Sequence, residues 1–276
     1  MGRDITLLDE GSFTASTDDV IVSRPGTLRE MILSMKAEPT SAADITTAAL
    51  LPLVQPFELK RNGVAFISIR GDDLYALNNY LMGYRPVAFA SSAATDYNSR
   101  VMGLRIPVYL AKGDDTLTYK ITRVAVSDAD TETLSLLARF QEAAPAQGWH
   151  EFTTYSYTPS ASGSSLRAMD VKSTGELIGL LIFGTTIPTT SADTTTVDKL
   201  QLRLDGEITH EATWQTLRAP SAPGNVADAT VPEGILDNYV FWDFREEPIA
   251  AGRRIEVYIN AGDTNAVRLI PIFRHT

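Results

Sequence analysis

Short runs of alternating or β-branched residues recur along the whole chain, and clusters of Gly, Asp, Asn, Ser and Pro separate them. Runs of this length, bounded by turn residues, are typical of β-strands. In the first half the predicted strands are Ile5–Leu8, Val20–Val22, Leu28–Met35, Phe57–Lys60, Val64–Ile69, Leu104–Leu110, Leu117–Val126 and Leu134–Phe140. In the second half they are Glu151–Tyr157, Ala168–Val171, Leu177–Phe183, Leu200–Leu204, Tyr239–Phe244, Ile255–Ile259 and Val267–Phe273. Many short strands with few helices predict an all-β sandwich or barrel.

Two segments predict short helices. Ser41–Leu51 begins with a capping residue and an acidic first turn, and Pro52 should end it. Asp72–Met82 begins with acidic residues, carries apolar residues at helical spacing, and is followed by Gly83 as a terminator.

The composition restricts the partners that we expect. The chain has 276 residues, 44% of them hydrophobic, so it can bury a sizeable core as one large domain or two small ones. Its 34 Asp and Glu residues outnumber 24 Lys and Arg residues, for a net charge of -10, and an acidic chain repels a phosphate backbone. The pairs Lys60-Arg61 and Arg253-Arg254 are isolated and are interpreted as solvated strand ends. We therefore expect no direct sequence-specific binding to nucleic acid.

The sequence contains neither an export signal pattern nor a long apolar segment. The N-terminus lacks a basic region followed by an apolar one, so export through the Sec pathway is not expected. The longest apolar runs, Ala48–Phe57 and Leu177–Phe183, are far shorter than the roughly 20 residues that span a bilayer. We expect a soluble protein.

Residues typical of catalytic or metal sites are few and scattered. There is no cysteine, and the histidines at 150, 210 and 275 form no metal-ligand motif. Asp72-Asp73 and Asp114-Asp115 could act as paired carboxylates, but charge at a helix start and solvation of a turn are the simpler interpretations. The sequence predicts no catalytic residue, no cofactor-binding residue, no metal ligand and no cofactor.

The two halves of the chain match each other in order. Ala143–Gly148 (AAPAQG) is an Ala- and Pro-rich segment near the midpoint and is interpreted as a linker. Five elements on either side of it correspond: Gly26–Leu33 with Gly175–Ile182, Leu59–Gly63 with Leu202–Gly206, Leu74 and Leu77 with Trp214 and Leu217, Leu117–Ile121 with Ile255–Ile259, and Leu134–Phe140 with Val267–Phe273. The second pair contains Asn62-Gly63 and Asp205-Gly206, which are strong hairpin-turn signals.

The offset between matching elements falls steadily, from 149 (175 minus 26) to 133 (267 minus 134). Loops absorb insertions and deletions whereas strands do not, so shorter loops in a second copy would produce this drift. Chance alignment of β-rich stretches could explain one match. Five ordered matches favour an internal duplication.

The duplicated sequence resembles the double jelly-roll major capsid proteins of tailless icosahedral viruses and bacteriophages with double-stranded DNA. The resemblance rests on the run Leu51–Gly63 with its Asn-Gly turn, on the following strand Val64–Ile69, and on Gly71–Leu77, which contains a DLY sequence. Leu200–Leu217 is similar to the equivalent element of a second jelly roll.

The resemblance implies two tandem jelly-roll β-sandwiches with one or two short helices. Residues 1–147 would form the first jelly roll with an N-terminal arm, and 148–276 the second. It also implies a structural protein rather than an enzyme, whose homotrimers form pseudo-hexameric capsomers of an icosahedral virion after synthesis in the host cytoplasm. Its partners would be neighbouring capsomers and minor capsid or penton proteins. Many viruses of this type enclose a lipid membrane, so an internal viral membrane is a further candidate.

Two questions stay open at the level of sequence. Tandem jelly rolls also occur in carbohydrate-binding or adhesion modules, and a jelly-roll glycoside hydrolase is a third possibility. The aromatic cluster Tyr239–Phe244 could line a sugar site, but a strand buried on one face or lying at a subunit interface is the simpler interpretation. Met1–Thr17 could be an arm that becomes ordered on assembly, or Ile5–Leu8 could pair as an edge strand of its own sandwich.

Overall fold

The structure is a computed structural model in which the chain divides into two compact units, Met1–His150 and Glu151–His275. It describes residues 4–12, 16–17, 19–22, 26–40, 43–83, 86, 89–92, 98–111, 115–141, 148–186, 195–221 and 232–275. Strand β10 (Trp149–Thr153) spans the boundary between the units in sequence. Each unit is described by itself.

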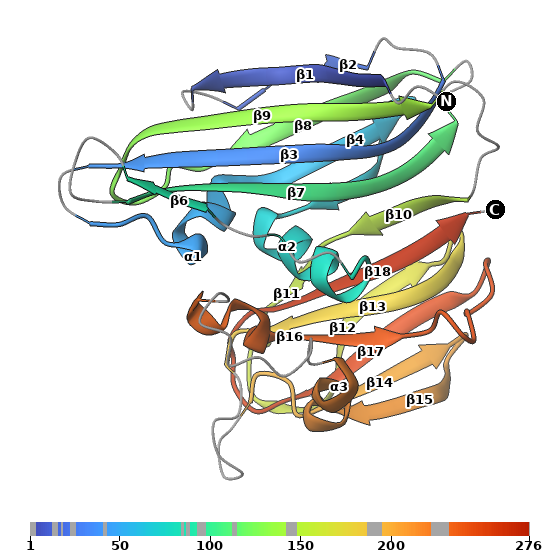
Figure 1. Cartoon of the computed structure of the whole chain (residues 1–276). Helices are drawn as coiled ribbons and strands as arrows, with labels where there is room; N and C mark the ends of the chain where they lie inside the picture. The colour runs from blue at the N-terminus through green and yellow to red at the C-terminus, as the bar shows by residue number, and fades with distance from the viewer. Residues whose placement is uncertain are drawn as a thin grey trace. The chain divides into compact units, whose positions relative to one another are not determined.

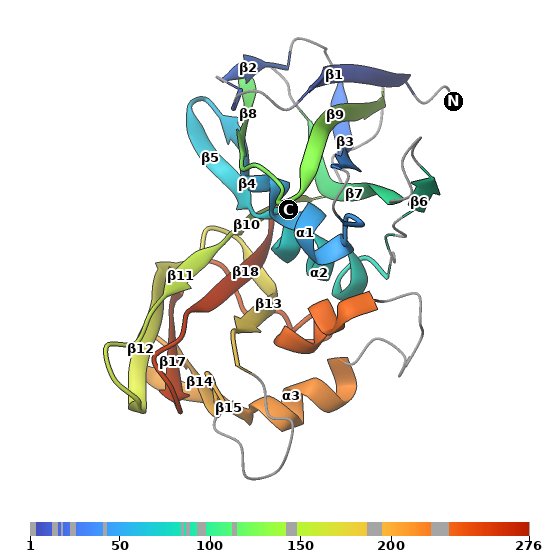
Figure 2. The same cartoon turned by 90° about the vertical axis from the view of Figure 1, so that its left-hand side faces the viewer.

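The first unit contains two β-sheets that form separate layers (Figures 1 and 2). One sheet has the order β1 (Asp4–Ser12), β9 (Ala129–Gln141), β3 (Thr27–Pro39), β7 (Asn98–Ala111) and β6 (Phe89–Ser92). The other layer contains, in order, β2 (Val20–Ile21), β8 (Leu117–Arg123), β4 (Val54–Arg61) and β5 (Val64–Ile69). All the strand pairs described in this unit are antiparallel.

Residue alternation explains how these layers enclose a core. Along β3, Leu33, Met35 and Ala37 are 0% exposed, while the residues between them are half-buried. Successive side chains of a strand point to opposite faces, so one face of β3 packs inward and the other faces away from the core. The same alternation holds along β9, from Leu134 to Phe140.

The second unit repeats this arrangement. One layer has the order β16 (Tyr239–Asp243), β13 (Glu176–Gly184), β18 (Val267–His275) and β11 (Tyr155–Tyr157). The other has the order β12 (Gly163–Lys172), β17 (Arg254–Ala261), β14 (Lys199–Leu204) and β15 (Glu207–Thr213). Its core joins apolar residues of both layers with Trp214 and Leu217 of α3 (Trp214–Ser221).

The two units share one topology. In sheet order, β1-β9-β3-β7 corresponds to β11-β18-β13-β16, and β2-β8-β4-β5 corresponds to β12-β17-β14-β15. Eight strands in two sheets connected in this way form a jelly roll. The all-β fold with two tandem jelly rolls is therefore confirmed, and each of the five matched sequence elements occupies equivalent positions in both units.

The two hairpin turns are equivalent down to single hydrogen bonds. Asn62 and Asp205 have φ of 51° and 52°, and the glycines that follow them have φ of 82° and 92°. The Thr116 amide donates to Asn62 Oδ1 at 2.9 Å, and the Arg254 amide donates to Asp205 Oδ1 at 2.9 Å. The reverse bonds, from the Asn62 and Asp205 amides to the Thr116 and Arg254 carbonyls, measure 2.8 and 2.9 Å. Side chains of the same shape therefore close the same turn in both copies.

The predicted helix at 41–51 is placed wrongly. Residues 41 and 42 lie outside the described residues, and α1 covers only Thr47–Leu50, capped by the Thr46 side chain, which accepts from the Ala49 amide at 3.1 Å. Asp44 does not belong to a first helical turn, because it accepts a hydrogen bond from the Asn98 amide at 2.6 Å. Pro52 lies inside the short 3₁₀ turn η1 (Leu51–Leu53) instead of ending a helix.

The second predicted helix is confirmed as α2 (Gly71–Tyr80), with Asp72 and Asp73 in its first turn. The sequence did not predict β6 or the 3₁₀ segment η2 (Pro232–Asn238). Among the described residues, no helix is both long and apolar enough to cross a membrane.

The two ends of the first unit concern the predicted N-terminal arm and the predicted linker. Asp4–Ser12 forms β1 and pairs with β9 from Asp4 opposite Phe140 to Ser12 opposite Thr133, so the structure contains the edge strand rather than a free arm in this segment. Of the predicted linker at 143–148, residues 143–147 lie outside the described residues.

Candidate functional site: an arginine-lined pocket

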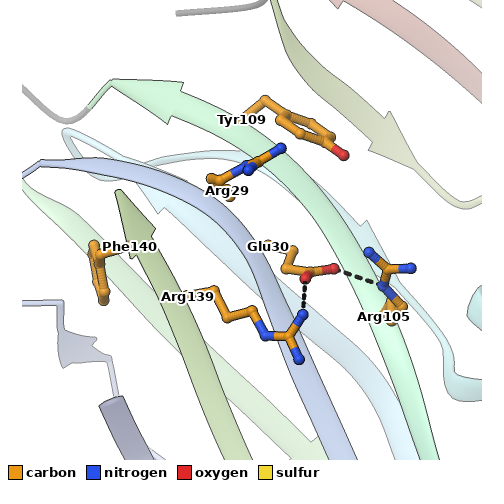
Figure 3. Close-up of a pocket in the computed structure, with 6 residues that line it drawn as sticks. All are labelled: Arg29, Glu30, Arg105, Tyr109, Arg139 and Phe140. Carbon is orange, nitrogen blue, oxygen red and sulfur yellow. Dashed lines mark hydrogen bonds and ion pairs between the residues drawn. The ribbon is translucent and has the colours of Figure 1, made fainter. Parts of the chain in front are cut away.

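A pocket opens on the first unit where β3, β7 and β9 lie side by side (Figure 3). It is lined by Arg29, Glu30, Arg105, Tyr109, Arg139 and Phe140. The space between these side chains is about 370 Å³, including the open solvent at its mouth. Arg105 and Arg139 alternate with residues buried in the core, so their side chains belong to the face of the sheet that points away from it.

Two irregularities in the strand register shape this pocket. Leu28 pairs with Phe140 and Glu30 with Arg139, so Arg29 is an extra residue relative to β9. Relative to β7, Leu28 pairs with Leu110 and Glu30 with Pro107, so two residues of β7 face Arg29 alone. One of these two is Tyr109, whose φ of 56° is unusual for a bulky residue. Bulges of this kind redirect side chains, and here they bring Arg29 and Glu30 to one pocket.

Glu30 organises the pocket electrostatically. Its side chain is only 7% exposed. Its Oε2 accepts a hydrogen bond from Arg105 Nε at 2.6 Å, and its Oε1 accepts one from Arg139 Nη1 at 2.6 Å (Figure 3). Both carboxylate oxygens are thus occupied, and each arginine is held by a charge-assisted bond.

The pocket carries an excess of positive charge. Three guanidinium groups face one carboxylate, which leaves a local charge of three minus one, or +2. The Arg29 guanidinium lies over the Tyr109 ring, 5.8 Å from its centroid, and makes no hydrogen bond or ion pair with any described residue. Arg139 Nε is buried without a hydrogen-bond partner in the described structure. Guanidinium groups in such a setting favour an anion that presents several oxygens, such as a carboxylate or a phosphate.

The carboxylates singled out in the sequence have structural partners. Asp72 accepts from Arg70 Nε at 3.1 Å at the start of α2. Asp115 accepts from Asn62 Nδ2 at 2.7 Å and from Arg61 Nε at 2.6 Å, and these bonds lower the pKa of Asp115. Asp114 lies outside the described residues. In the described parts of the chain, no three His, Cys, Asp or Glu side chains gather where they could hold a metal ion.

The three histidines have different surroundings. His150 lies edge-on to Tyr109 with ring centroids 5.7 Å apart. His210 lies edge-on to Phe244 at 5.4 Å, and His275 Nε2 is hydrogen-bonded to Glu151 at 2.8 Å. No two of them share a contact among those described.

Most of the aromatic cluster at 239–244 lies on strand β16, and all of its rings except that of the half-buried Trp242 are buried. Tyr239, Phe241 and Phe244 are 1%, 5% and 5% exposed. A sugar-binding platform needs open ring faces, and these three rings are packed inside the protein. Trp242 is half-buried, and its ring centroid lies 5.5 Å from that of Phe244. The strand interpretation is the one that the structure supports.

The basic pairs are neutralised one by one. Lys60 pairs with Asp19 at 2.8 Å and Arg61 with Asp115 at 2.5 Å. Arg253 pairs with Asp205 at 2.5 Å and Arg254 with Asp170 at 2.7 Å. The positive charges of these four residues are therefore each paired with a carboxylate.

The sequence did not reveal the arginine pocket. Glu30 lies 75 residues from Arg105 and 109 residues from Arg139, so no local motif joins them. Strand alternation does place Arg105 and Arg139 on the outward faces of their strands, and this was the one available signal.

Known proteins share this fold but not this sequence. No protein-family model matches the sequence, and none of the curated proteins is similar to it in sequence. Solved structures do match. The major capsid protein of Sulfolobus turreted icosahedral virus has a TM-score of 0.74 at 14% identity, over 100% of this chain and 97% of that one.

Two further capsid proteins match over almost the full length. Major capsid protein P2 of bacteriophage PM2 has a TM-score of 0.62 at 10% identity, over 99% of this chain and 97% of that one. The PBCV-1 capsid protein has a TM-score of 0.58 at 8% identity, over 99% and 93%. The chain therefore has the fold of the double jelly-roll major capsid proteins, as the sequence resemblance implied.

Proposed function

We propose that this chain is a major capsid protein, a structural component of an icosahedral virion. The observation that carries the proposal is the full-length match: both jelly rolls, in tandem, align with viral major capsid proteins over 97% of two of those chains. A single jelly roll occurs in proteins of many functions. Two jelly rolls in tandem, aligned along nearly the whole of both chains, are a much more specific similarity than one.

The assembly unit that we propose is a homotrimer. Two similar sandwiches per chain give a trimer six similar lobes, so a threefold oligomer can occupy a hexagonal lattice as a pseudo-hexameric capsomer. The sandwich boundary proposed from the sequence, 147/148, lies three residues before the division between the two compact units at 150/151. Neighbouring capsomers, minor capsid and penton proteins, and an internal viral membrane are the proposed further partners, with synthesis in the host cytoplasm.

A structural role fits better than the alternatives. The buried rings of Tyr239, Phe241 and Phe244 offer no sugar platform, which weakens the carbohydrate-binding alternative. The basic pairs Lys60-Arg61 and Arg253-Arg254 are each neutralised by carboxylates, so they do not form a phosphate-binding patch.

Solution mass and electron microscopy test this function. The purified chain of 30.1 kDa should form a particle of three copies, about 90 kDa, which builds shells or hexagonal arrays at high concentration. Obligate interfaces bury more than about 2,000 Å², so the trimer should persist at micromolar concentration. A monomer that binds glycans and never forms arrays would support the adhesion alternative instead.

A further inference from the structure

The residues that line the arginine pocket carry more positive than negative charge. Glu30 uses both oxygens on Arg105 and Arg139, and Arg29 has no hydrogen bond or ion pair within the described structure. Holding a third guanidinium beside two others costs free energy through like-charge repulsion. An arrangement of this kind is stabilised when an anion enters.

The backbone around the pocket is strained to build it. Tyr109 occupies the left-handed region at φ 56°, where a bulky residue is disfavoured, and its ring lies under Arg29. Residues held in such conformations concentrate at binding sites, where the surrounding structure fixes them. The strained backbone and the guanidinium therefore meet at one bulge, where Arg29 has only a cation–π contact among the described residues.

The chain itself is a source of such an anion. It carries a net charge of -10, and exposed carboxylates such as Glu246 and Glu247 make no hydrogen bond or ion pair with any described residue. Contacts around a threefold axis are heterologous, so one surface of each copy meets a different surface of the next. A cationic pocket on one copy and an acidic surface on its neighbour would be complementary, and complementary charge fixes register between partners.

We propose that the arginine pocket receives an Asp or Glu carboxylate from a second copy of this chain when copies assemble. The carboxylate would contact the Arg29 guanidinium next to the Tyr109 ring, beside the partly exposed Arg139 side chain. The proposal rests on the proposed function, because it needs copies of the chain to associate. It adds the site and the chemistry of one contact.

Charge reversal tests the contact. Arg29→Glu should raise the concentration at which half the protein is oligomeric by at least tenfold, and the loss should shrink as salt screens the pair. Lys172→Glu is the matched control, since it makes the same charge change at an exposed residue of β12, in the other unit, and it should stay within twofold of the natural protein. Analytical ultracentrifugation gives both values, and circular dichroism checks that each variant is folded.

Cross-linking identifies the partner group. Arg29→Lys keeps the positive charge and introduces an amine, which a carbodiimide joins to a carboxylate in direct contact. With a mixture of ¹⁵N-labelled and unlabelled copies, mass spectrometry should find peptides that contain the substituted position joined to acidic peptides of the other isotope. Joining only within one copy would overturn the proposal, and so would the absence of joining at the substituted position in assembled protein.

The capsid proposal and the pocket contact fail differently. If the natural protein assembles and Arg29→Glu assembles equally well, the pocket contact is wrong while the capsid proposal stands. If the natural protein stays monomeric under all conditions, the capsid proposal is wrong and the contact falls with it.

Discussion

Asn78 of α2 provides hydrogen bonds that a neighbouring strand would otherwise give to β7. Its side chain is 0% exposed. Its Nδ2 donates to the Arg105 carbonyl at 2.7 Å and to the Leu74 carbonyl at 2.9 Å, and its Oδ1 accepts from the Arg105 amide at 2.8 Å. On this side of β7, strand β6 pairs only with residues from Asn98 to Val101. Asn78 therefore completes the backbone pairing of β7 beside the arginine pocket.

Asn78→Ala should destabilise the first unit by about 3 kcal/mol. The substitution removes three hydrogen bonds, each worth about 1 kcal/mol net, and leaves the Arg105 amide and carbonyl without these partners. For a unit of this size, each kcal/mol lowers the thermal midpoint by about 2–4 °C, so a fall of roughly 6–12 °C is expected.

Asn79→Ala is the matched control for this prediction. Asn79 lies on the same helix, is half-buried, and its Nδ2 donates to the Tyr75 carbonyl at 2.8 Å. Its loss should cost about 1 kcal/mol or less. Urea unfolding and calorimetry at equal protein concentration measure both variants. Equal stabilities of the two variants would refute the role assigned to Asn78.

Three other features of the fold can each be tested by one change. Gly206→Ala should destabilise the second unit by about 1–2 kcal/mol in urea unfolding, because Gly206 has φ of 92°. Gly163→Ala is the control and should destabilise it less, because Gly163 lies outside the left-handed region. Equal losses of stability would contradict the turn geometry. Deleting residues 1–12 removes β1 and should lower the thermal midpoint by several degrees; an unchanged midpoint with lost assembly would instead support an N-terminal arm. Asp170→Asn should lower the thermal midpoint at pH 7, and the difference should shrink as the pH is lowered below 3.8. The hydrogen bond from Arg254 lowers the pKa of Asp170, so its contribution is present above the unfolded pKa and is lost as pH falls through the lower folded pKa. A difference in thermal midpoint that does not change as the pH is lowered would contradict it.

Most of the strands could be predicted because each is a local pattern. Val64–Ile69 was predicted with the bounds that β5 has, and the Asn62-Gly63 and Asp205-Gly206 turns were identified from two residues each. The alternation of buried and half-buried residues along β3 is the physical cause of the sequence pattern that predicted it.

The pocket could not be predicted because contacts between distant residues create it. The bulges at Arg29 and Tyr109 follow from the register of three strands, and no residue pattern in Thr27–Pro39 alone marks them. The misplaced helix at 41–51 has a similar cause: the Asn98 amide, 54 residues away, binds the Asp44 carboxylate that the sequence had assigned to a helix start. Local sequence patterns do not show which distant residues bind a polar side chain.

The most direct test of the central claim is the mass of the purified protein in solution together with electron microscopy of concentrated samples. We expect a stable particle of three 30.1 kDa chains, about 90 kDa, with a pseudo-hexagonal outline that packs into hexagonal arrays or closed shells. A protein that stays at the mass of one chain at micromolar concentration and physiological salt, and forms no arrays, would contradict it.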